Sequence, residues 1–359
     1  MTRVWLHVGA PKTGTTYLQD VLARNRTTLA GHGLMYPDTH SGSHFEAAID
    51  LIDHKWGGAL KAARGEWDSL ARAARTAPRG AVISHEVLAA ATPRQVARAR
   101  ASLAEADLHV VVTARDLARQ IPAEWQETVK HRGRKTFAQF LRQIRRAPRV
   151  SSDLWFWRVQ SLPDVLTRWG DGLPPENLHV VTVPQSGADP TLLWKRYAGV
   201  LGIDAGLDLE PAGRANQSMG IAETALIRRL NQQLKGRRIQ QPVYAGTVRD
   251  LLVHQTLANL DISERATIAP ADRPWVEEVT AEWLEWLEAS GVDVVGDAAD
   301  LKPRWSQEVW VDPDHPDPEA VTEAAVAAIA ALVAERSQVY RDMPVPMRSL
   351  GTLLRRIRG

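Results

Sequence analysis

The stretch Val4–Gln19, VWLHVGAPKTGTTYLQ, decides the fold. The apolar run Val4–Val8, bounded by Gly-Ala-Pro, predicts a short buried strand. A loop over Gly9–Gly14 follows, and a helix is expected from Thr15 onward. The helix prediction rests on an apolar stripe at helical spacing, formed by Tyr17, Leu18, Val21 and Leu22.

A strand, a small-residue loop and a helix N-terminus together predict an anion-binding site. Unpaired backbone N–H groups converge there, and the helix dipole adds partial positive charge. Lys12 adds a full charge in the same loop, while Thr13, Thr15 and Thr16 add hydroxyl donors. The simpler alternative is a strand–turn–helix with a capping threonine and a surface lysine. So many donors within six residues exceed what a turn requires, which favours the anion site.

The order of residues in this loop differs from that of a Walker A motif, in which the lysine follows the second glycine. Here Lys12 precedes Gly14. The order PKTGTT directly after an N-terminal strand resembles the 5′-phosphosulfate loop of sulfotransferases that use 3′-phosphoadenosine 5′-phosphosulfate (PAPS). The resemblance implies a P-loop-like α/β fold, PAPS as the donor substrate and adenosine 3′,5′-bisphosphate as the product.

Composition restricts the class of protein. The chain has 359 residues, 44% hydrophobic residues and no cysteine, which excludes disulfides, thiolate metal sites and cysteine nucleophiles. A first strand near residue 4 leaves no room for a signal peptide, and no run approaches the roughly 18 apolar residues of a membrane span. We therefore expect a soluble, cytoplasmic protein. A net charge of +2 without a basic stripe argues against a nucleic-acid partner.

Three further apolar runs predict strands, at Gly80–Ser84, Leu108–Thr113 and Leu178–Val183, with a possible short strand at Gly33–Pro37. Helical patterns alternate with them. This alternation is typical of a parallel sheet covered by helices on both faces, a three-layer α/β fold. The helices are expected at 45–60, 67–77, 93–103, 117–131 (with Pro122 causing a kink or a late start), 136–145, 155–169, 191–201 and 221–234.

The strand signal disappears from Lys235 onward. Helices are expected at Asp272–Ala289 and Pro318–Glu335, and the basic segment Met347–Gly359 is weakly amphipathic. We expect an α/β domain over residues 1–303, whose part from about 235 is helical, and a C-terminal helical extension with a basic tail over 304–359.

Ligands of such sheets bind at the carboxyl ends of the strands. Polar residues follow four strand ends, and all four are expected on one rim. These segments are Gly9–Thr16, His85-Glu86, Thr113–Asp116 and Pro184–Ser186.

The resemblance to sulfotransferases also implies a site for the 3′-phosphate, held by an arginine just after a strand with a serine eight residues on. Arg115 fits the arginine position, and its planar guanidinium suits bidentate phosphate contact. The serine position holds Ala123, so Arg119 or Gln126 is expected to supply the missing donor. The alternative for Arg115 is a surface arginine or an ion pair with Asp116.

A later polar segment, Arg214–Gly220, resembles the family's late phosphate loop. Its Asn216 and Ser218 are expected either to cap the following helix or to bind the nucleotide.

Sulfuryl transfer needs a cation at the leaving group and a base at the acceptor. Lys12 is the expected cation. Glu86 is the favoured base and His85 the second choice, because the resemblance implies either residue type. The alternative is that this pair only caps the following helix. No metal-binding spacing is present, so no metal cofactor is expected.

The sequence therefore predicts transfer of a sulfuryl group from PAPS to a hydroxyl or amine of a carbohydrate or small-molecule acceptor. Two alternatives stay open at this stage: an ATP-dependent P-loop kinase, and a catalytically inactive nucleotide-binding or scaffold relative. The sequence does not indicate which acceptor is used or what oligomeric state is formed.

Overall fold

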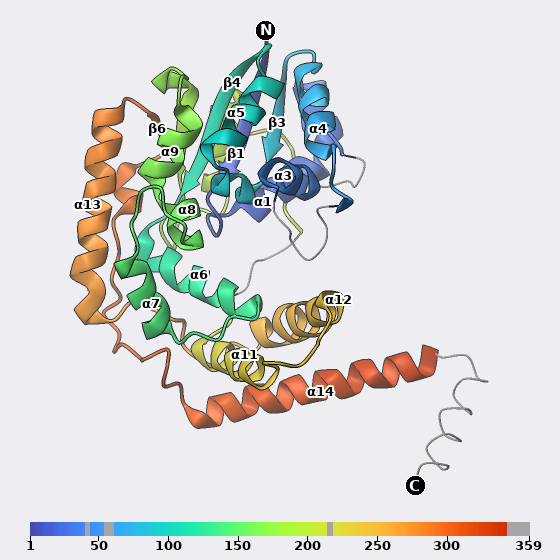
Figure 1. Cartoon of the computed structure of the whole chain (residues 1–359), viewed down its shortest axis with the longest axis vertical. Helices are drawn as coiled ribbons and strands as arrows, with labels where there is room; N and C mark the ends of the chain where they lie inside the picture. Colours follow the sequence, from blue (N-terminus) through green and yellow to red (C-terminus); the bar gives the residue numbers. More distant parts are fainter. Residues whose placement is uncertain (40–43, 54–60, 214–217, 343–359) are drawn as a thin grey trace. The chain divides into compact units, whose positions relative to one another are not determined.

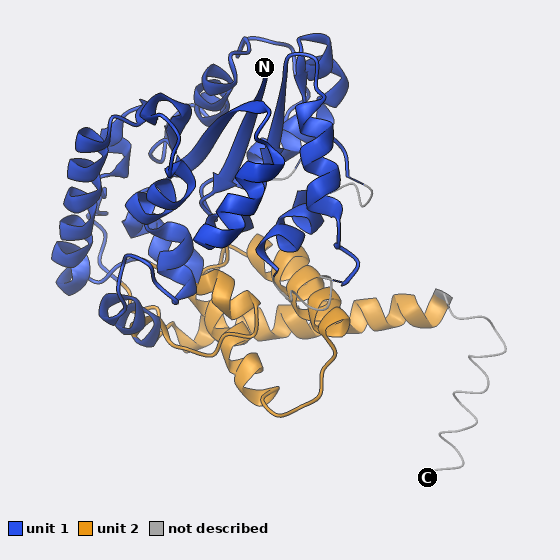
Figure 2. Ribbon diagram, turned by 45° about the horizontal axis from the view of Figure 1, so that its top comes forward, with its two compact units in different colours: residues 1–124, 139–216, 267–310 blue, residues 125–138, 217–266, 311–359 orange. Residues whose placement is uncertain are grey.

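The computed structural model describes residues 1–39, 44–53, 61–213 and 218–342 (Figure 1). The chain divides into two compact units (Figure 2). Unit 1 comprises residues 1–124, 139–216 and 267–310, and unit 2 comprises residues 125–138, 217–266 and 311–359. Among the described helices, none combines the length and the hydropathy that crossing a membrane requires.

Unit 1 holds a six-stranded sheet in the order β2-β3-β1-β4-β5-β6, with every pair of neighbours parallel. Strand β1 lies between β3 and β4, where Leu6 pairs with Ile83 and with Val110. The carboxyl ends of these three strands are therefore adjacent. The strands are β1 (Thr2–Gly9), β2 (Leu34–Met35), β3 (Gly80–Ser84), β4 (Ala106–Ala114), β5 (Leu178–Thr182) and β6 (Asp293–Val295).

Helices cover both faces of the sheet, which makes unit 1 a three-layer α/β fold. Helices α1, α2 and α10 pack on one face, and α4 and α9 contact the other, with α3 and α5 packed beside them. The helices of unit 1 are α1 (Thr15–Arg24), α2 (Arg26–Gly31), α3 (His44–Ile52), α4 (Glu66–Arg75), α5 (Pro93–Ser102), α8 (Trp155–Gln160), α9 (Leu162–Gly170), α10 (Leu192–Leu201) and α13 (Arg273–Ser290).

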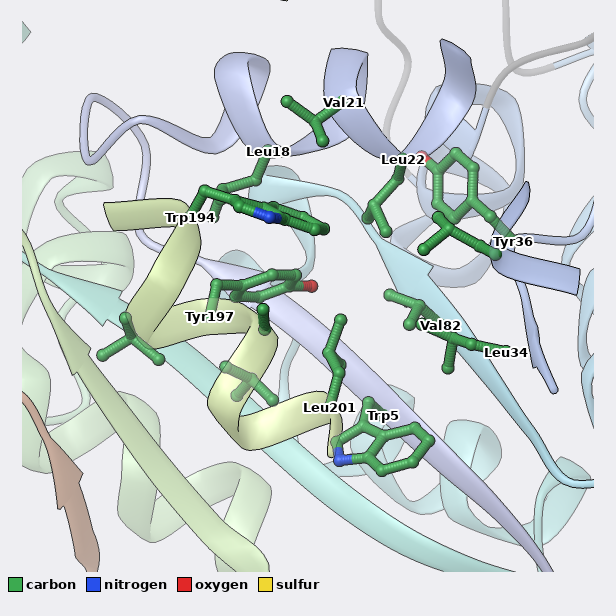
Figure 3. Close-up of a cluster of buried hydrophobic side chains, with 14 of the residues drawn as sticks. Trp5, Leu18, Val21, Leu22, Leu34, Tyr36, Val82, Trp194, Tyr197 and Leu201 are labelled. Atoms are coloured by element: carbon green, nitrogen blue, oxygen red, sulfur yellow. The ribbon is translucent and has the colours of Figure 1, made fainter. Parts of the chain in front are cut away.

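The core of the first face is shown in Figure 3. Alternate residues of β1 point to opposite faces, so Trp5 joins this core while Leu6 faces the other side. Trp194 and Tyr197 of α10 fill the space between α1 and the sheet. His7 lies on the same face as Trp5, and its ring packs 5.1 Å from that of Tyr197.

Unit 2 is helical in its described part. It holds α11 (Ile221–Gln233), α12 (Gln241–Tyr244), the π-helix η4 (Ala245–Thr256) and α14 (Pro318–Asp342). Within this unit α14 packs against α11 and η4. Helices α6 (Leu117–Lys130) and α7 (Phe137–Arg146) each contribute residues to both units.

The predicted strands are all confirmed, Gly80–Ser84 with its predicted bounds. The prediction that no strand follows Lys235 is wrong, because β6 adds to the sheet edge beside β5. With only three residues, β6 carries too little apolar pattern for detection.

The single helix expected at 155–169 is two helices, α8 and α9, separated at the extended Ser161. Pro163 occupies the first turn of α9, a position that favours a helix start. The late start considered for the helix at Leu117 is wrong, because α6 begins there and contains Pro122. Helix α14 runs to Asp342, seven residues beyond the expected end.

Candidate functional site

The loop between β1 and α1 has a backbone shaped for close approach of a ligand. Lys12 and Gly14 both have positive φ angles, 64° and 88°. A Cβ atom on Gly14 would lie 2.5 Å from Cδ2 of Leu193, so this position favours glycine for two reasons. The N-cap residue of α1 is Gly14, which has no side chain to accept hydrogen bonds, so the first-turn N–H groups are not capped by it.

The three loop threonines have different environments. Thr16 is exposed and Thr15 is buried. The hydroxyl of Thr13 points into the protein, where its Oγ1 atom lies 2.5 Å from both the carbonyl oxygen of Ala10 and Oγ1 of Thr113. The side chain of Thr13 therefore shapes the loop from below, and only its backbone is available to a ligand.

A buried hydrogen-bond chain lies beneath the loop. Nδ1 of His7 is 2.8 Å from Oγ of Ser84, and Nε2 is 3.3 Å from Oγ1 of Thr113. Oγ1 of Thr113 also lies 3.1 Å from the Gly9 carbonyl oxygen, to which it can donate. With a neutral ring, Ser84 donates to Nδ1 of His7 and Nε2 of His7 donates to Thr113, while the hydroxyls of Thr113 and Thr13 are hydrogen-bonded to each other or to the Gly9 and Ala10 carbonyls. This chain joins β3, β1 and β4 to the loop.

His7 is fully buried, and burial lowers its pKa to about 4. The ring is therefore neutral at physiological pH, as the chain of hydrogen bonds requires. His44 of α3 is similar: it accepts a hydrogen bond from the Ser84 backbone N–H at 3.1 Å and donates to the Pro37 carbonyl at 2.8 Å. Burial likewise lowers its pKa to about 4.

The predicted base pair follows β3. Glu86 begins the 3₁₀ helix η2 (Glu86–Ala90), and His85 is its N-cap. Nδ1 of His85 accepts a hydrogen bond from the Val87 backbone N–H at 3.3 Å and lies 3.8 Å from the Glu86 carboxylate. The capping alternative is thus real for His85, because the ring nitrogen that caps η2 is occupied. The other nitrogen, Nε2, carries the hydrogen when the ring is neutral.

The carboxylate of Glu86 is held in its ionised form. Burial raises its pKa, but the charges of His85 and Lys12 and hydrogen bonds from Gln19 and its own backbone N–H lower it further, so the pKa lies below its usual value. The hydrogen bond from Nε2 of Gln19 measures 3.0 Å. Because Lys12 contributes to this shift, the loop cation and the carboxylate lie within electrostatic reach of each other.

Helix α9 fixes the position of η2. Arg168 is mostly buried and donates hydrogen bonds to the carbonyls of Ala89, at 3.0 Å, and Ala91. Trp169 donates from Nε1 to the carbonyl of Leu88 at 3.2 Å. The short helix that carries Glu86 is therefore held through its backbone carbonyls by two side chains of α9.

Arg115 follows β4 and reaches the loop. Its Nη1 donates to the Lys12 carbonyl at 3.3 Å, so the guanidinium lies against the backbone of the loop. The carboxylate of the neighbouring Asp116 is engaged by Arg119, which donates to Oδ1 from its backbone at 3.0 Å and to Oδ2 from Nε. These contacts bring two arginines and a lysine to the ends of β1 and β4.

Gln126 and Arg119, the two residues expected to replace a serine at position 123, make different contacts. Gln126 donates to the Met219 carbonyl at 2.8 Å and to Oγ1 of Thr224 at 3.1 Å, both within unit 2. Arg119 donates from Nη1 to the Pro184 carbonyl at 3.2 Å, whereas its buried Nη2 has no hydrogen-bond partner among the described residues. Arg119 is therefore the better placed donor.

Two residues of the polar segment Arg214–Gly220, Asn216 and Ser218, are also predicted to belong to the site. Asn216 lies outside the described residues, and Ser218 is exposed in unit 2 just before α11. The predictions for both residues stay untested.

Sequence reasoning missed the residues that support the loop. His7, Ser84 and Thr113 face the same side of three neighbouring strands, but in sequence each appears as an ordinary strand residue. Gln120 and Gln160 both donate to the Pro11 carbonyl, the latter at 3.0 Å. A polar residue inside an apolar strand two positions before the loop was the available signal for His7. Among the described residues, no group of three or more acidic, His or Cys side chains is arranged to hold a metal ion.

Comparison with known proteins gave limited results. No family model and no curated protein matches the chain. The solved "Sulfotransferase Domain from the Curacin Biosynthetic Pathway" is similar over 60% of this chain and 78% of that chain, with 12% identity and a TM-score of 0.34. A sulfotransferase from Alicyclobacillus acidocaldarius is similar over 64% of this chain and 93% of that chain, with 15% identity and a TM-score of 0.38. At such TM-scores, the chemistry of the site has to be inferred from its own residues.

Proposed function

We propose that the protein transfers a sulfuryl group from PAPS to a hydroxyl or amine of a carbohydrate or small-molecule acceptor. The observation that carries the proposal is the arrangement at the carboxyl ends of β1, β3 and β4. A phosphate-type loop with Lys12 and Arg115 lies there, and the ionised Glu86 is within electrostatic reach of Lys12. A polyanionic donor and a base for its acceptor are thus provided at one edge of the sheet.

The residues fit a nucleotide with anionic groups at two positions. The backbone N–H groups of the α1 N-terminus, with Lys12, suit the 5′-phosphosulfate. Arg115 and the unused Nη2 of Arg119 suit the 3′-phosphate. In this assignment Arg119 takes the place of the serine that is absent at position 123.

The residues divide the chemistry between them. When bound, PAPS supplies the sulfuryl group, whose bond to the phosphate oxygen breaks as the acceptor oxygen or nitrogen bonds to sulfur. Glu86 accepts the acceptor's proton, a role that requires the ionised carboxylate described above. Lys12 stabilises the negative charge left on the phosphate oxygen. Gln19 holds the Glu86 carboxylate through its hydrogen bond, and His85, with one ring nitrogen engaged, is the alternative base.

Isothermal titration calorimetry tests the donor. We expect adenosine 3′,5′-bisphosphate to bind in EDTA, and ATP to bind much more weakly with or without Mg²⁺. The K12A and R115A variants should each lose at least about tenfold in bisphosphate affinity, since each removes a charged hydrogen-bonding group. Lys195→Ala is the matched control, because Lys195 is exposed and pairs with Asp189. Tight, Mg²⁺-dependent binding of ATP instead would support the kinase alternative.

An acceptor screen with PAPS tests the reaction. In the presence of a working acceptor, Glu86→Gln should lower kcat by about 10²- to 10⁴-fold and leave bisphosphate affinity within about twofold. Wild-type turnover in this variant would remove Glu86 from the mechanism, and the same experiment with His85→Gln would then test the alternative base. Bisphosphate binding without turnover on any acceptor would favour the inactive relative.

A further inference from the structure

Helix α14 carries apolar side chains on the side that faces solvent. Val321, Ala324 and Ala328 are buried within unit 2. On the opposite side Val326, Ile329 and Val333 are 62%, 60% and 64% exposed, and Tyr340 is 48% exposed. A helix that only covered its own unit would need one apolar stripe, and α14 has two.

The exposed stripe follows the repeat of a coiled coil. Successive residues on this side are spaced alternately three and four apart, which is the spacing of the two core positions of a heptad. We call this set the α14 seam; it consists of Glu319, Thr322, Val326, Ile329, Val333, Arg336 and Tyr340. Val326, Ile329 and Val333 lie in the middle, with Glu319 toward the N-terminal end and Arg336, followed by Tyr340, toward the C-terminal end.

We propose that the α14 seam binds the α14 seam of a second copy of this chain, with the two helices antiparallel. A two-fold axis between Ala327 and Ala328 places Val326 against Ile329 of the second copy. The next layers outward pair Thr322 with Val333, and the outermost pair Glu319 with Arg336. This register buries the apolar residues together and ends each side in an ion pair.

Charge selects the antiparallel orientation over the parallel one. In a parallel pair in register, Glu319 would face Glu319 and Arg336 would face Arg336, and like charges at such short range are unfavourable. The antiparallel pair instead forms two opposite-charge contacts.

The surface at the seam's N-terminal half has a matching shape. An open, mostly apolar hollow is lined by Pro318, Glu319, Thr322, Glu323 and Val326. In the proposed register Val333 of the second copy lies over Thr322, at the centre of this hollow. The contact spans the 18 residues from Glu319 to Arg336, about 27 Å of helix. Such an interface is smaller than that of a permanent dimer, so we expect a dimer that forms in the micromolar range.

Sedimentation equilibrium of the full chain over a concentration series tests the proposal. We expect a monomer–dimer equilibrium that Ile329→Glu abolishes. Glu319→Arg and Arg336→Glu should each weaken dimerisation at least about tenfold, and the double variant should restore it. Glu335→Arg is the matched control, since Glu335 is exposed and lies half a turn round from Val326. A monomer at every concentration, or no rescue by the double variant, would overturn the proposal.

Orientation is tested by cross-linking, which is clean because the chain has no cysteine. In the antiparallel register, two copies of residue 336 lie about 25 Å apart along the axis. An oxidised mixture of Glu319→Cys and Arg336→Cys chains should therefore form disulfide-linked heterodimers, whereas Arg336→Cys alone should not cross-link. Cross-linking of Arg336→Cys alone would contradict the antiparallel arrangement.

Discussion

The buried His7 should make the protein unstable to mild acid. Its pKa is lowered from 6.5 to about 4 by burial, so the unfolded chain binds a proton that the folded protein resists. Stability contributed by the neutral ring is therefore fully present above the unfolded pKa. It decreases as the pH falls from about 6.5 toward 4 and changes little below that.

The magnitude follows from the two pKa values. Between pH 7 and pH 5, a single histidine with these values lowers the free energy of unfolding by about 2 kcal/mol. His44 has the same shift and should contribute a similar amount. Replacing His7 with glutamine removes its titration but keeps an amide that can donate toward Thr113. Between pH 7 and pH 5, the free energy of unfolding of the variant should therefore fall by about 2 kcal/mol less than that of the wild type.

Urea denaturation of both proteins at pH 5, 6 and 7 measures this difference. Contributions from other titrating groups cancel, because the comparison is between two slopes of stability against pH. His32→Gln is the matched control, since the His32 ring is exposed to water. If His7→Gln and wild type show parallel pH dependence, His7 is not held neutral by burial and the hydrogen-bond chain beneath the loop has been assigned wrongly.

Three further predictions concern the supports of the site. Thr113→Val should weaken the binding of adenosine 3′,5′-bisphosphate about tenfold, because the Thr113 hydroxyl links His7 to the loop, and Thr113→Ser should keep wild-type affinity. The control is Thr182→Val, at an equally buried threonine of β5, which should leave the bisphosphate affinity measured by calorimetry unchanged. Gly14→Ala should lower the free energy of unfolding, measured in urea, by about 1–3 kcal/mol, because φ of Gly14 is 88° and the added Cβ would meet the Leu193 side chain. An unchanged midpoint of urea denaturation would show that the loop backbone differs from the one described. Arg168→Lys should lower kcat and leave bisphosphate affinity intact, because η2 loses its carbonyl contacts; a loss of affinity with unchanged kcat would contradict a role in placing Glu86.

The strands and the loop could be predicted because their signals are local. Apolar β-branched runs such as Leu108–Thr113 need no partner to be recognised, and the small residues around Lys12 mark a loop. The rule that ligands bind at the carboxyl ends of parallel strands then placed Arg115 and His85-Glu86 on one edge, which the sheet order confirms.

The inner surface of the site could not be predicted in this way. Thr13 looks like a ligand donor in sequence, and only the presence of Thr113 one hundred residues later turns its hydroxyl inward. Likewise the choice between Arg119 and Gln126 depends on contacts with Asp116 and Met219 that no spacing reveals. Local patterns predict elements, whereas the direction of a polar side chain depends on residues distant in the sequence.

The central position of β1 has a consequence for the order in which the chain can fold. This strand is synthesised before both of its neighbours in the sheet: Val4 pairs with Ala81 on one side and Leu108 on the other. Until β4 has been synthesised, the hydroxyl of Thr13 cannot form its hydrogen bond with Thr113, and the loop lacks this contact with the sheet. Contacts so distant in sequence form slowly. During synthesis the apolar β1 therefore lacks its β4 partner until about a hundred further residues have been made, which makes the β1 segment a natural place for a chaperone to bind.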